Sequence, residues 1–86
     1  MYKLVYNYKE TVENKVLVDL NYFFGDTFRL KRFAVHYLLD IVQNEYREEG
    51  YGTEQVTGSA IYCYKSEFTE DKKRKTIQWV ICVKKM

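Results

Sequence analysis

The chain has 86 residues, the length of a single domain (1–86) near the lower limit for folding without disulfides or metals. With 47% hydrophobic, 17% aromatic and 30% charged residues, its composition excludes an intrinsically disordered protein. A net charge of +2 is too small to identify a nucleic-acid-binding protein from electrostatics alone.

The cysteine content and the N-terminal sequence indicate the compartment. Cys63 and Cys82 are too few for a disulfide scaffold. The N-terminus lacks a charged segment followed by an apolar run, and no stretch approaches the roughly 18–20 apolar residues of a membrane span. We therefore expect a cytoplasmic protein with two free thiols and no membrane association.

The first two predicted elements are strands that form a hairpin. Residues 2–8 and 15–22 both alternate apolar with polar side chains, the pattern of strands with one buried face. Residues 10–14 form the turn between them. Pairing Tyr6 with Val18 places the apolar side chains of both strands on the same face, which fixes the expected register.

The third predicted element is a helix from Phe28 to Arg47. Before it, Gly25-Asp26-Thr27 supplies a chain break and two possible N-cap residues. Glycines at positions 50 and 52 end it. The face expected to pack on the sheet consists of Leu30, Phe33, Ala34, Tyr37, Leu38 and Ile41.

The last predicted elements are strands 55–68 and 75–84, joined by the turn 70–74. Centring the turn there pairs Tyr64 with Ile81 on the core face, and Tyr62 with Val83. Cys63 and Cys82 then face each other on the opposite side. Because Gly58 lies inside the third strand, we expect a bulge or bend there.

The element order is ββαββ. It predicts an α+β fold with one helix packed on a mostly antiparallel four-stranded sheet. The side chains expected to be almost fully buried are Val18, Leu20, Phe33, Leu38, Ile41, Trp79 and Ile81.

Catalytic motifs are absent from the sequence. The single histidine, His36, stands four residues before Asp40 on the polar face of the helix, and we interpret it as a solvated side chain rather than a catalytic base. No phosphate-binding loop or zinc-ligand pattern occurs. We predict a protein that is not an enzyme and uses no metal or cofactor.

A second apolar stripe runs along the predicted helix. Val35, Leu39, Val42 and Tyr46 recur at helical spacing, about 100° or more from the core face. One interpretation is that a curled sheet or the chain after Arg47 covers the stripe. The other is that it binds a partner or a second copy of the chain, as an antiparallel helix pair in a homodimer.

Charges oppose the dipole of the predicted helix. Basic residues occupy its first turns and acidic residues its last, at a cost of about 0.3–1 kcal/mol for each exposed charge. Ion pairs to other elements would offset this cost, or an oppositely charged partner would. The turn near residues 72–75 is basic as well. It is either a solvated loop or a contact for phosphate or an acidic surface. The candidate charged contacts are Arg29, Lys31, Arg32, Glu45, Glu48, Glu49, Glu54, Lys72, Lys73 and Arg74.

These features predict a non-catalytic protein-binding module. Because the chain is short, lacks proline and is rich in Asn, Lys and Tyr, we expect a phage or mobile-element protein acting in the host cytosol. Its partner would be a host nuclease or other host enzyme that it inhibits or assists, as anti-CRISPR proteins do. The glutamates at 45, 48, 49 and 54 would mimic phosphates.

The alternative is a small nucleic-acid-binding regulatory protein that uses Arg29, Lys31, Arg32 and the 72–75 turn. Tyrosines on an exposed sheet face would favour it, but the predicted register places Tyr62 and Tyr64 on the core face.

Overall fold

The computed structural model describes the backbone of residues 1–86 and the side chains of residues 1–22 and 26–86. The helical segment is α1 (Lys31–Ile41) followed directly by one π-helical turn, η1 (Val42–Tyr46). The strands of the described backbone are β1 (Tyr2–Val12), β2 (Lys15–Phe28), β3 (Gly52–Thr57), β4 (Ala60–Phe68) and β5 (Arg74–Lys85).

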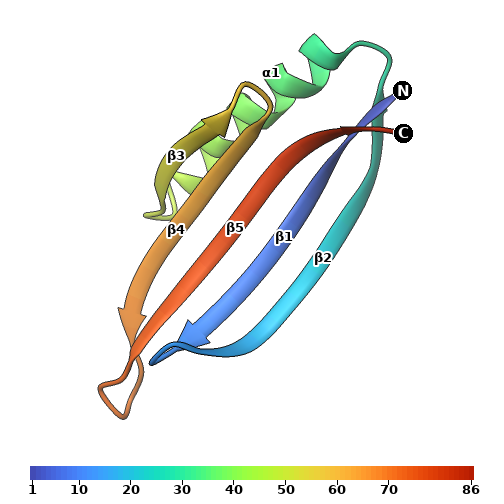
Figure 1. The fold of residues 1–86 in the computed structure, drawn as a ribbon. Coiled ribbons are helices and arrows are strands. Elements are labelled where there is room, and N and C mark those ends of the chain that lie inside the picture. The colour runs from blue at the N-terminus through green and yellow to red at the C-terminus, as the bar shows by residue number, and fades with distance from the viewer.

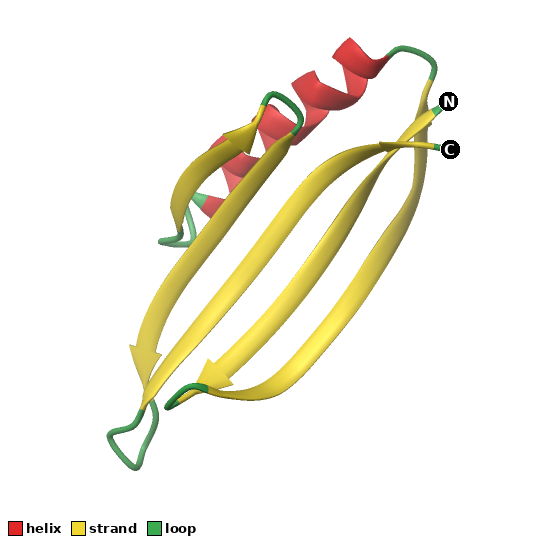
Figure 2. Ribbon diagram, in the orientation of Figure 1, coloured by secondary structure: helices red, strands yellow, loops and turns green.

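The strands form one antiparallel sheet in the order β2-β1-β5-β4-β3. The helix lies across one face of the sheet, and no element of the described chain covers the opposite face (Figure 1). The molecule is elongated, with extents of 47 × 22 × 20 Å. Both termini and the start of α1 lie at one end, whereas the β1–β2 and β4–β5 turns lie at the other (Figure 2).

The predicted α+β class, with one helix on an antiparallel sheet, is confirmed, but the four-stranded sheet is wrong. The predicted third strand is two strands, β3 and β4, separated by a turn at Gly58 and Ser59. The hydroxyl of Thr57 accepts a hydrogen bond from the Ser59 N–H at 3.2 Å and closes this turn. The bend expected at Gly58 is therefore the turn of a third hairpin, formed by β3 and β4.

The helix begins later than predicted. Asp26 and Thr27 do not cap it, because β1 holds this part of the chain in β2, where Lys3 pairs with Thr27. The N-cap is Leu30, which makes no side-chain capping hydrogen bond. Pairing with β1 therefore prevails over the capping propensity of Asp and Thr.

The C-terminal end of the helix agrees with the prediction. Gly50 adopts φ +90°, a left-handed conformation that glycine tolerates, and Tyr51 N–H donates to the Tyr46 carbonyl at 3.0 Å. In η1 the Arg47 N–H reaches the Val42 carbonyl, five residues back, at 3.1 Å. This wider turn advances each residue by less than the 100° of an α-helix, so Tyr46 stays over the sheet.

The first hairpin pairs with a different register from the predicted one. Glu13 and Asn14 both have positive φ, as in a two-residue type I′ turn, and Tyr6 pairs with Tyr22 instead of Val18. The shift is even, so Val18, Leu20 and Tyr22 keep the expected face of the sheet, but a register change between Glu10 and Thr11 places Val16 on the other face. The shift also carries Leu20 away from the helix, and Leu20 is exposed.

The predicted register of the second hairpin is also wrong, and here the error places the side chains of β4 on the wrong faces of the sheet. The structure pairs Ile61 with Ile81 and Cys63 with Trp79, an odd shift from the prediction. Ile61 and Cys63 therefore face the helix, while Tyr62 and Tyr64 face the uncovered side. The two cysteines lie on opposite faces of the sheet. They are free thiols, as predicted.

The core lies between the helix and the half of β1, β5 and β4 that is nearer the chain termini. Leu38 and Ile81 are fully buried, as predicted. Phe33 is 50% exposed, contrary to the prediction. The helix turns Ala34, Leu38 and Val42 toward the sheet, and Phe33 lies to the side of this row. The buried cluster consists of Leu4, Tyr6, Leu38, Val42, Ile61, Cys63 and Ile81, with Ile41, Tyr46, Tyr51, Trp79 and Val83 packed against it.

Truncating Leu38 and its neighbour Leu39 tests this helix orientation. Leu38 is 1% exposed and Leu39 is 44% exposed. Leu38→Ala should lower the free energy of unfolding by about 2–5 kcal/mol, since it leaves a cavity in the core. Leu39→Ala should lower it by less than about 1 kcal/mol. Urea unfolding followed by circular dichroism measures both, and equal losses would contradict this packing.

Candidate binding surfaces

The apolar helix stripe predicted as an interface is divided in the structure. Val42 is buried and Tyr46 packs against the core, whereas Leu39 is exposed and Val35 is half-buried. The π-helical turn causes this division because it keeps the last helical turn over the sheet. The four residues therefore do not form a continuous exposed strip: Val42 and Tyr46 are covered, as in the first of the two interpretations, and Leu39 is left exposed.

The basic residues at the start of the helix belong to a larger group. Strand pairing places Lys3 opposite Lys84, and Tyr2 opposite both Lys85 and Phe28. The helix start is close to this pairing because only two residues separate β2 from α1. One end of the molecule, which we call the basic end, therefore carries Lys3, Arg29, Lys31, Arg32, Lys84 and Lys85.

The other predicted charged contacts are separated from the basic end. Lys72 and Lys73 lie in the turn between β4 and β5, at the opposite end of the long axis (Figure 1), and Arg74 begins β5 there. In this turn the Thr69 hydroxyl accepts a hydrogen bond from the Lys73 N–H at 3.2 Å. The two basic segments of the nucleic-acid hypothesis therefore cannot contact one short ligand together.

The predicted acidic contacts do not form a single surface either. Glu54 pairs with Tyr62, which places it on the uncovered face of the sheet. Glu45 lies on the helix side, and Glu48 and Glu49 are exposed in the turn after η1. The structure therefore gives no continuous row of carboxylates that would resemble a nucleic-acid strand.

The uncovered sheet face carries an apolar patch opposite the helix. Val5 pairs with Cys82, Cys82 also pairs with Ala60, and Val80 pairs with Tyr62, so these side chains share one face. We call this the open-face patch, consisting of Val5, Ala60, Tyr62, Tyr64, Val80 and Cys82. The sequence prediction missed its tyrosines because the wrong register turned them inward.

Two tyrosines of the patch lie flat against each other. The rings of Tyr62 and Tyr64 stack with centroids 5.2 Å apart and an interplanar angle of 25°. Gly52 on the neighbouring strand makes room for them, since a Cβ there would stand 2.8 Å from the Tyr64 ring. Tyr64 is 41% exposed, so this pair presents an aromatic surface to solvent.

On the helix side, the single tryptophan organises a cluster of tyrosines. Ring centroids of Tyr6, Tyr8, Tyr22 and Tyr46 lie 4.6–6.2 Å from that of Trp79. The Trp79 indole N–H donates to the Tyr51 hydroxyl at 3.3 Å. Such contacts add stability beyond the area they bury, and they fix the orientation of the rings.

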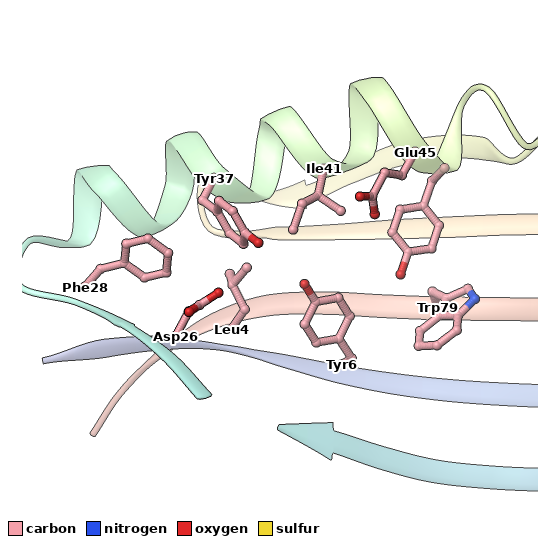
Figure 3. A pocket seen from close by; sticks show the side chains of 9 residues that line it. Leu4, Tyr6, Asp26, Phe28, Tyr37, Ile41, Glu45 and Trp79 are labelled. Atoms are coloured by element: carbon pink, nitrogen blue, oxygen red, sulfur yellow. The ribbon is translucent and has the colours of Figure 1, made fainter. Parts of the chain in front are cut away.

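A cleft opens beside this cluster, between the helix and the β1–β2 side of the sheet. Its volume is about 220 Å³. Figure 3 shows its side chains: α1 and η1 supply one wall, and β1, β2 and β5 supply the other. The lining residues are Leu4, Tyr6, Asp26, Phe28, Tyr37, Ile41, Glu45, Tyr46 and Trp79.

Two tyrosines of the cleft, Tyr6 and Tyr46, resist ionisation. Burial raises the pKa of Tyr6 to about 12, and the proximity of Tyr37, Glu45 and Asp26 contributes to the rise. Burial also raises the pKa of Tyr46 well above its ordinary value, with smaller contributions from Tyr6 and other neighbours. Both phenols stay protonated at neutral pH and can donate hydrogen bonds.

The residues His36 and Asp40 line a second, more open groove between the helix and β3, with a volume of about 570 Å³. Both are exposed, as expected for the polar face. Asp40 accepts a hydrogen bond from the Asn44 amide at 3.0 Å, which ties its carboxylate to the helix.

Comparisons with protein families, with curated proteins and with solved structures found no match to this chain. Among the described residues, no helix combines the length and the apolar character needed to cross a membrane.

The raised pKa of Tyr6 predicts a specific loss of stability in alkali. The folded pKa of about 12 lies above the ordinary value of 10.0, so this contribution is complete below pH 10 and is lost as the pH rises through 12. Tyrosinate absorbance and circular dichroism should show Tyr6 titrating together with unfolding. In Tyr6→Phe the stability should fall less steeply over this interval; an unchanged profile would contradict the assignment.

Proposed function

We propose that the chain is a non-catalytic protein-binding module that uses the open-face patch. The observation that carries the proposal is that an apolar, partly aromatic sheet face lies opposite the helix with no described element covering it. Monomeric proteins rarely leave such contiguous apolar surface exposed unless something binds it. Tyrosine is among the residues enriched at protein interfaces.

The surroundings of the patch support this use. Polar side chains border it, with Asn7 opposite Val80 and Gln78 opposite Tyr64. The Asn7 amide donates to Asp19 and Asn21 at 3.0 Å each, which holds this border in place. An apolar centre with a polar rim is the usual anatomy of a protein interface.

The finer parts of the hypothesis belong to the same proposal. The partner is a host nuclease or other host enzyme in the cytoplasm, which a phage or mobile-element protein inhibits or assists. Its support is the small size and the composition of the chain. Self-association as a homodimer remains a proposal as well, with the open-face patch replacing the helix stripe as the contact surface.

Two glutamate substitutions on opposite sides of the molecule test this proposal. Val80 lies on the open-face patch, whereas Leu39 lines the groove between the helix and β3 on the other side of the sheet, and both are exposed. A charge at position 80 would have to be desolvated in the interface, so Val80→Glu should abolish partner binding while Leu39→Glu retains it. Affinity capture from host lysate with all three proteins, with circular dichroism as the folding control, measures this.

If Val80→Glu and wild type capture the same proteins, the open-face patch is not the interface. If light scattering shows that Val80→Glu converts a dimer into a folded monomer, the partner is a second copy of the chain.

A second candidate function is single-stranded nucleic-acid binding. The specific observation in its favour is that the stacked Tyr62–Tyr64 pair is on the uncovered face, where Lys3 and Lys84 pair at the edge of the basic end. Exposed aromatic rings stack on unpaired bases, and cationic side chains contact the phosphates.

Salt dependence tests the nucleic-acid function. For a single strand, each phosphate contact contributes about 0.7 to the slope of log affinity against log salt. Replacing Arg32 and Lys84 together by Gln should therefore reduce the slope by about 1.4. Replacing Lys72 and Lys73 by Gln, at the far end of the molecule, should leave it unchanged. Absence of salt-dependent oligonucleotide binding by the wild type would eliminate this function.

A further inference from the structure

The cleft between the helix and the β1–β2 side of the sheet has an acidic, aromatic interior. Five of its lining side chains are aromatic, namely Tyr6, Phe28, Tyr37, Tyr46 and Trp79. Two more, Asp26 and Glu45, are carboxylates, whereas no Lys, Arg or His lines it. Figure 3 shows the Asp26 carboxylate beside Leu4 and Tyr37, and the Glu45 carboxylate beside Ile41.

The two carboxylates have no cationic partner within the described part of the chain. The ion pairs there join Lys75 to Glu10 at 2.6 Å and to Glu67 at 3.9 Å, both on the strands. Both carboxylates lie near Tyr6 and add to the rise of its pKa, of which burial is the largest cause and the proximity of Tyr37 the next. The side chains that line the cleft therefore carry two negative charges and no positive one.

The size and the walls of the cleft restrict the ligand. A volume of about 220 Å³ is below the roughly 300–1,000 Å³ of sites for drug-sized molecules, so one side-chain-sized group fits. Aromatic faces attract cations. Guanidinium is planar, stacks on aromatic rings, is more weakly hydrated than ammonium and can pair with carboxylates through two hydrogen bonds.

We propose that this cleft binds the guanidinium group of an arginine side chain presented by a partner protein. Asp26 and Glu45 supply the countercharge from opposite sides, while Tyr37, Tyr46 and Trp79 supply aromatic faces. The proposal extends the protein-binding function proposed above, but the site lies on the opposite side of the sheet from the open-face patch. The two can therefore be tested separately.

The test uses small probes and the single tryptophan of the full-length protein. N-acetyl-arginine amide carries the guanidinium, and N-acetyl-citrulline amide replaces it with a neutral urea of the same shape. Trp79 fluorescence and the NMR signal of its indole N–H report occupancy of the cleft. The arginine probe should bind with a dissociation constant on the order of 1–10 mM, and the citrulline probe at least about tenfold more weakly.

Matched variants assign the binding to the two carboxylates. Asp26→Asn together with Glu45→Gln should weaken arginine binding at least about tenfold and remove the preference over citrulline. Glu48→Gln, also exposed at the end of the helix but outside the cleft, should leave it unchanged. Both altered positions are exposed, so the fold should persist; circular dichroism checks it, and Glu45→Gln alone provides a milder variant.

The proposal is overturned if the arginine probe produces no saturable change up to about 50 mM, or if it binds no better than citrulline. It is also overturned if the charge-neutralised variants, still folded, bind the arginine probe as tightly as the wild type. None of these outcomes depends on the open-face patch. Conversely, loss of partner binding in Val80→Glu with retained arginine binding would support both proposals.

Discussion

The helix is much shorter than the sheet that it must cover, and this mismatch determines the surfaces of the protein. At about 1.5 Å per residue, the helical run 31–46 is about 24 Å long. The 12 residues of β5, at about 3.3 Å each, extend about 40 Å. One helix therefore covers about half of one sheet face. The core is confined to that half, and the other half exposes both of its faces to solvent.

At the edges of the covered half, aromatic side chains shield the core from solvent. The line Ala34–Leu38–Val42 lies over the centre of the sheet, on Ile81 and its neighbours. On the β2 side, the Phe28 and Tyr37 rings meet with centroids 5.3 Å apart. Trp79 and the tyrosine rings around it form the edge of the core that is farther from the chain termini. These bulky rings span the gap without filling it, and the cleft is the space that remains.

The elements of the fold follow from the sequence much better than their pairing does. Alternation located β1, β2 and β5, and the 3.6-residue period located most of the helix, because these patterns depend on one segment at a time. The register of β4 against β5 depends on where the turn is centred, and both faces of β4 carry large apolar side chains. Ile61–Cys63 and Tyr62–Tyr64 are equally plausible core residues, so the hydrophobic pattern could not select between them. Because the predicted register placed Tyr62 and Tyr64 in the core, the sequence did not reveal the open-face patch.

The candidate cleft was unpredictable for a related reason. Asp26 was assigned to a helix cap because Asp and Thr before an apolar periodic segment are typical of one. Only the pairing of Lys3 with Thr27, more than twenty residues apart, keeps Asp26 in a strand where its carboxylate faces the helix. Glu45, in contrast, was singled out by its charge alone. Local sequence thus identified one carboxylate of the pair, and long-range pairing supplied the other.

The charges that oppose the helix dipole gain a physical explanation from these positions. Lys31 and Arg32 occupy the first turn, where the dipole disfavours cations, and Glu45 occupies the last, where it disfavours anions. No ion pair within the described residues offsets either end. Instead, Lys31 and Arg32 lie at the basic end, and Glu45 faces the cleft. A helix selected for stability alone would exchange these charges. The observed placement is expected if the basic end and the cleft both bind oppositely charged groups, because such binding would offset the free energy that these charges cost the folded helix.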